Sequence, residues 1–153
     1  MSREKYLRFM RLAIEQAQKG KKQGEVPIGA VLLMPDGETF AAHNAPISQH
    51  DASAHAEMQV IRAACKAVGN YRLTGSTLYV TLEPCLMCAG VIVHARIARV
   101  VYGANDPTAG AVESLYQLLA DPRLNHQPEV VGGIMAEECG ILLKSFFQDR
   151  RKT

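Results

Sequence analysis

The chain has 153 residues, of which 48% are hydrophobic and 21% charged, and its formal net charge is +2. This length and composition are typical of one soluble globular domain, so we expect a single domain over residues 1–153. No apolar run reaches the ~18 residues that a membrane span requires, and the small net charge does not by itself indicate a nucleic-acid partner.

The first half of the chain predicts a helix, a hairpin and a second helix. Ser2 can cap a helix whose apolar residues recur every three or four positions as far as Ala17, and Gly20 and Gly24 end it. The elements expected next are a buried strand over 26–34, a turn at 35–37, a strand over 39–43, a polar loop over 44–53 and a helix over 54–68.

The second half alternates strands and helices. Pro84 is expected to open a helix that runs to about Ala95, because proline suits the first helical position. The predicted strands are 77–82, 99–102 and 129–131, and the other predicted helices are 114–120 and 137–150.

This order of elements predicts an α/β fold. An antiparallel pair followed by parallel crossover units gives a mixed sheet of about five strands with helices on its faces. In such sheets, sites form where strands end and helices begin.

The N-terminal region and the cysteines indicate a compartment. Charges are spread through residues 1–20, without the uninterrupted apolar segment of a signal peptide. We therefore expect a cytoplasmic protein in a reducing environment, whose four cysteines are metal ligands, nucleophiles or buried small residues before they are disulfides.

Two short motifs carry the chemistry, and each falls at the start of a predicted helix. The first is His55-Ala56-Glu57, and the second is Pro84-Cys85-Leu86-Met87-Cys88. Cys85 and Cys88 are spaced i, i+3, so both sulfurs point the same way, and a helix N-terminus favours thiolates. With His55 they make three protein ligands. A catalytic zinc site keeps its fourth position for water, whereas a structural site is usually closed by four ligands.

Each motif alone permits another interpretation. A single Cys-x-x-Cys after a strand could be a thioredoxin-like redox pair, and three or four ligands could hold a purely structural zinc ion. The combination of His-x-Glu with Pro-Cys-x-x-Cys is the signature of zinc deaminases, which replace an exocyclic amine of a nucleobase by oxygen.

That reaction requires these residue types. Zinc lowers the pKa of its bound water to about 7, so hydroxide becomes available to attack the ring carbon. A proton must also reach the neighbouring ring nitrogen, and later the departing amine. Glu57 is the only acid beside all three ligands, so we expect it to move these protons.

With these motifs in hand, the chain resembles the bacterial tRNA-specific adenosine deaminases, which convert the wobble adenosine of the anticodon loop to inosine. The resemblance covers nearly the whole chain. The segments that carry it are Glu25 to Val31, His55 to Glu57, Asn70 to Leu73, Thr77 to Gly90, Val100 to Ala104, Leu124 to His126, Glu138-Cys139 and Phe146-Phe147.

The resemblance implies a three-layer α/β/α cytidine-deaminase-like fold, one zinc ion per subunit, a tRNA anticodon stem-loop as partner, and a homodimer with active sites near the subunit interface. By match of position, Asn44 would hydrogen-bond the edge of the flipped-out adenine. Asp51 and Asp106 would lie in loops that line the pocket. The positions matching those near the bound RNA loop are His126, Phe147 and Arg150.

One departure bears on RNA binding. After Asp106, relatives often carry a lysine followed by Thr-Gly or Gly-Gly, whereas this chain has Thr108-Ala109-Gly110. A lysine that contacts phosphate is thus missing from this loop.

Two other functions compete with deamination of tRNA. The first is deamination of a free base or nucleoside, such as guanine or cytosine, by the same metal chemistry. The second is a non-catalytic, zinc-stabilised RNA-binding subunit, against which the intact Glu57 argues. The basic C-terminus and the Phe146-Phe147 pair favour RNA, because RNA loops are bound by stacking and phosphate contacts.

Overall fold

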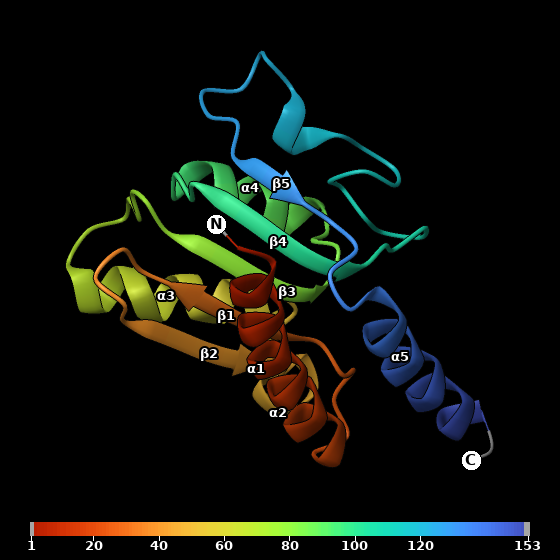
Figure 1. Ribbon diagram of the computed structural model, residues 1–153. Helices are drawn as coiled ribbons and strands as arrows, with labels where there is room; N and C mark the ends of the chain where they lie inside the picture. Colours follow the sequence, from red (N-terminus) through yellow and green to blue (C-terminus); the bar gives the residue numbers. More distant parts are fainter. Residues whose placement is uncertain (1, 152–153) are drawn as a thin grey trace.

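The computed structural model describes residues 2–151 and shows a five-stranded sheet between two layers of helices (Figure 1). The α1 and α5 helices cover one face of the sheet, and α3 and α4 cover the other. No helix within 2–151 has the length and apolar character needed to cross a membrane. The elements are α1 (Arg3–Lys22), β1 (Gly29–Leu33), β2 (Thr39–His43), α2 (Pro46–Gln49), α3 (Ala56–Val68), β3 (Thr77–Leu82), α4 (Leu86–His94), β4 (Arg99–Ala104), the 3-10 turn η1 (Leu118–Ala120), β5 (Glu129–Val131) and α5 (Ala136–Arg151).

The strand order β2-β1-β3-β4-β5 brings the segments that follow β2, β3 and β4 to the same end of the sheet. The β1 strand is antiparallel to both β2 and β3, whereas β3, β4 and β5 are parallel. Because two antiparallel steps restore the direction, β2 runs the same way as β3 and β4. The carboxyl ends of these three strands therefore lie together, which is where sites form in α/β proteins. The predicted α/β/α fold is confirmed.

The central strands are buried on both faces, and their alternation divides the core in two. Leu32, Leu78 and Val100 pack on the side of α3 and α4, whereas Val31, Tyr79 and Val101 pack on the side of α1. Successive residues of a strand point to opposite faces, so each of these strands supplies both layers.

Gly29 sets the distance between α1 and β1. A Cβ atom at this position would lie 1.9 Å from the carbonyl oxygen of Ala13, which is a backbone atom of α1. Only glycine allows the helix and the strand to approach so closely.

The sequence-based boundaries need four main corrections. The loop expected over 44–53 contains α2, and the helix expected over 114–120 is reduced to η1. The fourth helix begins at Leu86, with Cys85 as its N-cap, so Pro84 precedes the helix instead of opening it. The first strand is also shorter than expected, since β1 begins only at Gly29.

Candidate metal centre and active site

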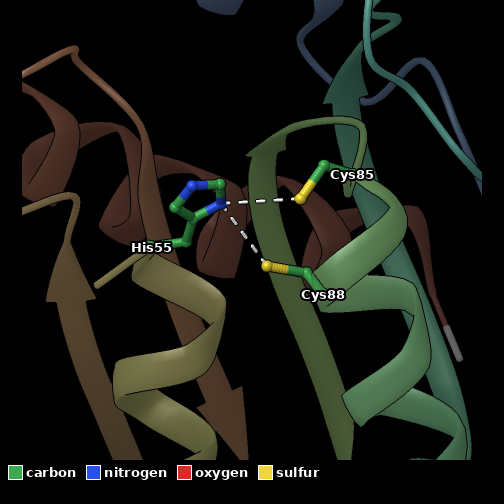
Figure 2. A group of neighbouring side chains, drawn as sticks. All are labelled: His55, Cys85 and Cys88. Atoms are coloured by element: carbon green, nitrogen blue, oxygen red, sulfur yellow. Dashed lines mark hydrogen bonds between the residues drawn. The ribbon is translucent and has the colours of Figure 1, made fainter. Parts of the chain in front are cut away.

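The three candidate metal ligands lie at the starts of two neighbouring helices. His55 is the N-cap of α3, and Cys85 is the N-cap of α4, each with an extended backbone conformation. Cys88 lies three residues after Cys85, so its sulfur returns to the same side of the first turn. Figure 2 shows the two sulfur atoms facing one ring nitrogen of His55.

The distances fit a zinc ion. Nδ1 of His55 lies 3.6 Å from Sγ of Cys85 and 3.6 Å from Sγ of Cys88, and all three ligand atoms lie within 4.8 Å of one another. Tetrahedral zinc, with bonds of ~2.0–2.1 Å to nitrogen and ~2.3 Å to sulfur, separates its N and S ligands by about 3.5 Å. Hydrogen bonds with Cys88 and His55 lower the pKa of the Cys85 thiol well below its usual range, whereas the hydrogen bond with Cys85 and burial raise the pKa of the Cys88 thiol. Without a metal the pair therefore holds one thiolate, at Cys85, and Cys88 must release its proton when a metal binds.

Glu57 lies in the first turn of α3, two residues after His55. Its side chain is only 3% exposed, and burial raises the pKa of Glu57 to about 7. A carboxyl group whose pKa lies near neutrality can both accept and release a proton at physiological pH. This residue therefore has the chemical properties expected of a proton carrier beside the metal ligands.

A cleft of about 490 Å³ opens at the carboxyl ends of the strands. Asn44, which follows β2, lines it, and its Oδ1 atom accepts a hydrogen bond of 2.8 Å from the backbone N–H of Ala56. That donor fixes the orientation of the amide, because only the oxygen can accept. The amide nitrogen makes no hydrogen bond within residues 2–151 and is available as a donor in the cleft, next to the helix start that carries His55.

Asp106 and Thr108, from the loop after β4, line the same cleft. Oδ1 of Asp106 accepts hydrogen bonds from the backbone N–H and the hydroxyl of Thr108, at 3.1 and 2.8 Å, so this oxygen shapes the loop. Within the described residues, the second carboxylate oxygen accepts no hydrogen bond. It remains an acceptor for a ligand.

Glu83, which follows β3 and precedes Pro84-Cys85, is a functional residue that the sequence analysis missed. Its carboxylate, in a side chain 2% exposed, accepts hydrogen bonds from three successive backbone N–H groups, those of Val112, Glu113 and Ser114, at 2.8 to 3.0 Å. The N–H of Asp106 and the hydroxyl of Ser114 also donate to it. Burial alone would raise its pKa, but these hydrogen bonds outweigh burial and lower the pKa of Glu83 to about 2.

Glu83 is thus an ionised group that fixes the cleft-lining loop, and it is no candidate for the general base. A Cβ atom on Gly110 would lie 2.4 Å from its carboxylate oxygens, so the loop can pass there only as glycine. The available sequence signal was an acidic residue directly between a buried strand and a metal-ligand motif.

Comparisons with known proteins agree with this geometry. Residues 3–104, which include all three candidate ligands, match the family described as the cytidine and deoxycytidylate deaminase zinc-binding region. The tRNA-specific adenosine deaminase of Bacillus subtilis (strain 168) is 53% identical over 145 residues, covering 94% of this chain and 89% of that protein. The chain belongs to the tRNA-specific adenosine deaminase family.

Solved structures extend the comparison. A structure described for A-to-I editing by tRNA:A34 deaminases at the wobble position of transfer RNA has a TM-score of 0.85 and 47% identity, over 89% of this chain and 99% of that one. Guanine deaminase from Bacillus subtilis has a TM-score of 0.62 and 29% identity, over 100% of this chain and 96% of that one. The tRNA-specific adenosine deaminase family therefore shares its fold with a deaminase whose named substrate is the base guanine.

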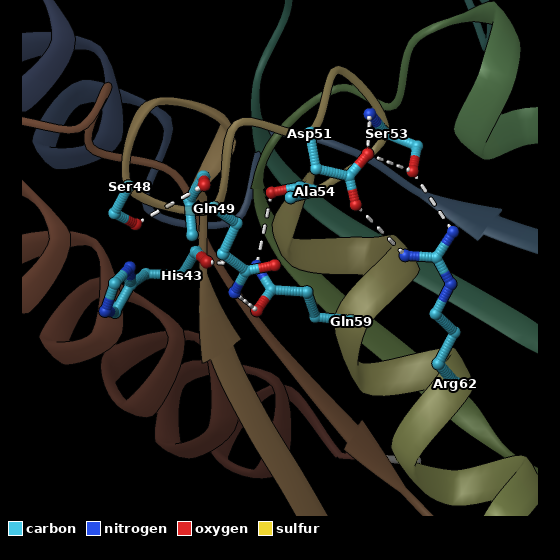
Figure 3. Close-up of polar contacts among 9 residues, drawn as sticks. His43, Ser48, Gln49, Asp51, Ser53, Ala54, Gln59 and Arg62 are labelled. Atoms are coloured by element: carbon cyan, nitrogen blue, oxygen red, sulfur yellow. Dashed lines mark hydrogen bonds and ion pairs between the residues drawn. The ribbon is translucent and has the colours of Figure 1, made fainter.

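Asp51 stabilises the loop that precedes His55. It shapes the loop before His55: its Oδ1 accepts hydrogen bonds from the N–H and the hydroxyl of Ser53, at 2.9 and 2.8 Å (Figure 3). Arg62 of α3 lies 4.0 Å from the other oxygen and donates to the Ser53 hydroxyl. The structure does not place Asp51 among the residues that line the cleft.

The three positions matched to RNA contacts are not brought together in one chain. Phe147 lines the cleft and is 44% exposed. Arg150 donates a hydrogen bond to the carbonyl of Gly24, and its guanidinium lies 4.8 Å from the centre of the Phe146 ring, so it holds α5 against the end of α1. Nε2 of His126 lies 2.6 Å from the carbonyl oxygen of Ile97. Ile97 precedes β4, so His126 lies at the end of the sheet opposite to the cleft. RNA contacts by Arg150 and His126 stay predictions.

Proposed function

We infer that this protein is a zinc-dependent deaminase that converts adenosine to inosine at the wobble position of tRNA. The observation that carries this conclusion is the group of His55, Cys85 and Cys88 with the buried Glu57. Asn44, which lines the neighbouring cleft, is hydrogen-bonded to Ala56, the residue between His55 and Glu57. The 47–53% identity over nearly the whole chain to proteins of that specificity supports the choice of substrate.

The residues of the chain account for the remaining chemistry. Zinc, when held by the three ligands, supplies an acidified water as nucleophile. Glu57 would take one proton from the attacking water and deliver it to N1 of adenine. It would then take the remaining proton from the new hydroxyl group on C6 and deliver it to the exocyclic amine, so that a C6 carbonyl remains. A bond from water oxygen to C6 forms, the bond from C6 to the amine breaks, and ammonia leaves. Glu57 is well placed because it follows the His55 ligand by two residues and is shielded from solvent.

Asn44 and Asp106 would hold the nucleotide in the cleft. The free amide nitrogen of Asn44 can donate to a ring nitrogen at the edge of the base, because its oxygen is already held by Ala56. The unpaired oxygen of Asp106 can accept from a ribose hydroxyl. Both contacts require a base that has left its stack, and a base in an anticodon loop is easily unstacked.

The test compares substrates directly. Purified protein is incubated with a minimal anticodon stem-loop, with free adenosine and with free guanine or cytosine, and the products are separated by chromatography. We expect inosine from the stem-loop and a kcat/KM for the free compounds that is lower by orders of magnitude, since they offer no flanking contacts. Comparable kcat/KM for guanine or cytosine would favour the alternative of a free-base deaminase.

We also propose that the protein is a homodimer that uses the face of α3 and α4. An apolar groove of about 320 Å³ lies there, lined by Met58, Ile61, Tyr71 and Val91, and Tyr71 is more than half exposed. Exposed apolar surface of this kind marks interaction sites. Light scattering should report twice the chain mass, and Val91→Asp should produce monomers; a monomeric wild-type protein at micromolar concentration would contradict the proposal.

The cysteines support a cytoplasmic location, which we propose on that basis. All four are free thiols, and two of them belong to the metal-ligand group. Free thiols persist in a reducing compartment.

A further inference from the structure

The segment that carries the metal ligand Cys85 is paired with one loop of the cleft. Cys85 forms an isolated antiparallel β-bridge with Gly110. The carbonyl of the residue before it, Pro84, accepts a hydrogen bond of 2.9 Å from the backbone N–H of Ala111. The ligand segment and the loop over 105–114 are therefore joined through their backbones.

The side chain of Glu83 extends this contact from the other side of Pro84. Besides the three N–H groups of residues 112–114, its carboxylate accepts hydrogen bonds from Nδ2 of Asn105 at 3.2 Å, from the N–H of Asp106 at 3.0 Å and from the hydroxyl of Ser114. Donors from both ends of the loop thus meet at one buried group. A buried carboxylate that lost these donors would be costly, so Glu83 and the loop keep their positions together.

Cys85 connects this loop to the metal centre. A ligand must keep its sulfur ~2.3 Å from a zinc ion, so metal binding restrains the backbone of Cys85 and of Glu83, two residues earlier. If the ligand segment shifted, the carboxylate of Glu83 would move away from its donors. If the loop were disordered, the backbone of Cys85 would lose its partner. Groups hydrogen-bonded behind the ligands of a metal typically change its affinity ~10–100-fold.

We propose that Ser114 and Asn105 are positioning residues for the metal centre, which act through Glu83 and the backbone of Cys85, so that zinc binding and order in the loop over 105–114 stabilise each other. Such a coupling is reciprocal, because the factor by which loop order tightens metal binding is also the factor by which the metal favours loop order. The proposal goes beyond the proposed function, since it concerns retention of the metal and does not depend on which base is deaminated.

The first test measures the rate at which the zinc-loaded protein releases its metal to an excess of a chromophoric chelator. Ser114→Ala and Asn105→Ala each remove a donor to Glu83 and leave all three metal ligands intact. Each should release zinc about three- to tenfold faster than wild type, the range in which residues between two coupled sites usually act. Ser114→Thr keeps a hydroxyl and should stay within about twofold of wild type. The matched control is Ser145→Ala, whose hydroxyl accepts from Lys21 on the far side of α5, and its release rate should not change.

Hydrogen exchange measures the coupling in the opposite direction. The amide protons of residues 111–114 should exchange about tenfold more slowly in zinc-loaded than in metal-depleted wild type, whereas those of Arg123 and Leu124, which donate within another loop, should not change. Equal protection of 111–114 in both forms, or an equal loss of protection throughout the chain, would overturn the proposal. Unchanged zinc release in both alanine variants would also overturn it and leave the proposed function intact, whereas a wild-type protein that binds no zinc would reject the metal centre itself.

Discussion

At the scale of single residues, the candidate metal centre depends on side chains that occupy helix caps. His55 and Cys85 take positions that are usually occupied by Ser, Thr, Asp or Asn, and neither makes a capping hydrogen bond. Both side chains are consequently free to bind a metal, and the positive ends of two helix dipoles favour the thiolates.

The ligand set can be tested by removing one sulfur. Cys88→Ala should lose the zinc ion that we expect at about one per chain, and it should unfold more readily, because metal binding is coupled to folding. Elemental analysis and thermal unfolding by circular dichroism measure the two effects. Cys65→Ala, at a half-buried cysteine outside the ligand group, is the control and should keep its zinc. Full activity in a zinc-free Cys88→Ala protein would remove the assignment.

The proton carrier can be tested without disturbing the ligands. Glu57→Gln has nearly the same shape and leaves all three ligands intact, so zinc content should match the wild type. Turnover should fall by at least ~10²–10⁴-fold, the usual contribution of one general acid–base step. Single-turnover kinetics with a saturating stem-loop isolate this step. A variant with a tenth of the wild-type rate would show that another group moves the protons.

At the scale of elements, buried carboxylates fix two loops whose shape the local sequence does not determine. Glu25 accepts hydrogen bonds from the N–H groups of Ile47 and Ser48, at 3.1 and 2.7 Å, and thereby caps α2. Glu83 does the same for residues 112–114. In each case the acceptor comes from a distant part of the chain and satisfies N–H groups that would otherwise be unpaired.

Glu83→Gln tests the second of these loops. The amide places an NH₂ group against N–H donors, so we expect a loss of about 2 to 4 kcal/mol in the free energy of unfolding. The kcat/KM of the folded variant should also fall, since Asp106 loses its support. Urea unfolding and stem-loop kinetics measure these effects. Asp121→Asn, which removes a carboxylate paired with the exposed Arg123, should leave the free energy of unfolding nearly unchanged. Equal losses in both variants would contradict a special role for Glu83.

Glu25 should make stability depend on pH. Burial would raise its pKa, but the hydrogen bonds from Ser48 and Ile47 outweigh burial, and the pKa lies below its ordinary value of 4.5. A lowered folded-state pKa stabilises the protein above pH 4.5, and this stabilisation is lost as the pH falls further.

We therefore expect Glu25→Gln to cost about 1.5 to 3 kcal/mol at pH 7, the usual worth of hydrogen bonds to a charged group, and less at pH 4 and below. Urea unfolding across this range measures the difference. Glu15→Gln, at an exposed position of α1, should show no such trend. A cost for Glu25→Gln that stays constant between pH 7 and pH 3 would contradict the argument.

Hydrogen bonds that the local sequence does not determine explain which sequence predictions were wrong. Strands β2, β3 and β5 match the predicted boundaries, because alternation or apolar runs mark them locally. The α2 helix was missed since its cap, Glu25, lies more than twenty residues away. The helix expected from residue 114 fails because Leu115 and Leu118 donate their N–H groups to the carbonyls of Gly110 and Ala111, which are not the i−4 partners of an α-helix.

The metal ligands of the candidate site could be predicted from the sequence, whereas the residues that line the cleft could not. The spacing of His55, Glu57, Cys85 and Cys88 is a local signal, and the structure brings the three ligands together as expected. The positions of Asn44 and Asp106 in the lining of one cleft could not be derived from spacing, because they depend on which strand ends meet at the same end of the sheet.

At the scale of the whole molecule, the sheet order separates the two halves of the metal centre. His55 follows β2 and Cys85 follows β3, yet β1 lies between these two strands, although it precedes both in the chain. The polypeptide from β2 through α3 to β3 therefore passes over β1, so we expect the ligands to meet only after β1 has paired on both sides.

A metal ion bound by both His55 and Cys85 would consequently form one of the last contacts during folding. We expect such a contact to be absent from the folding transition state, and contacts of that kind slow unfolding without speeding folding. Zinc should lengthen the lifetime of the native protein in denaturant and leave the refolding rate within about twofold of its metal-free value. Stopped-flow fluorescence or circular dichroism, with zinc and with a chelator, measures both rates. Faster refolding in zinc would mean that the ligands meet before the sheet is complete. It would contradict the expectation that zinc acts on the unfolding rate alone.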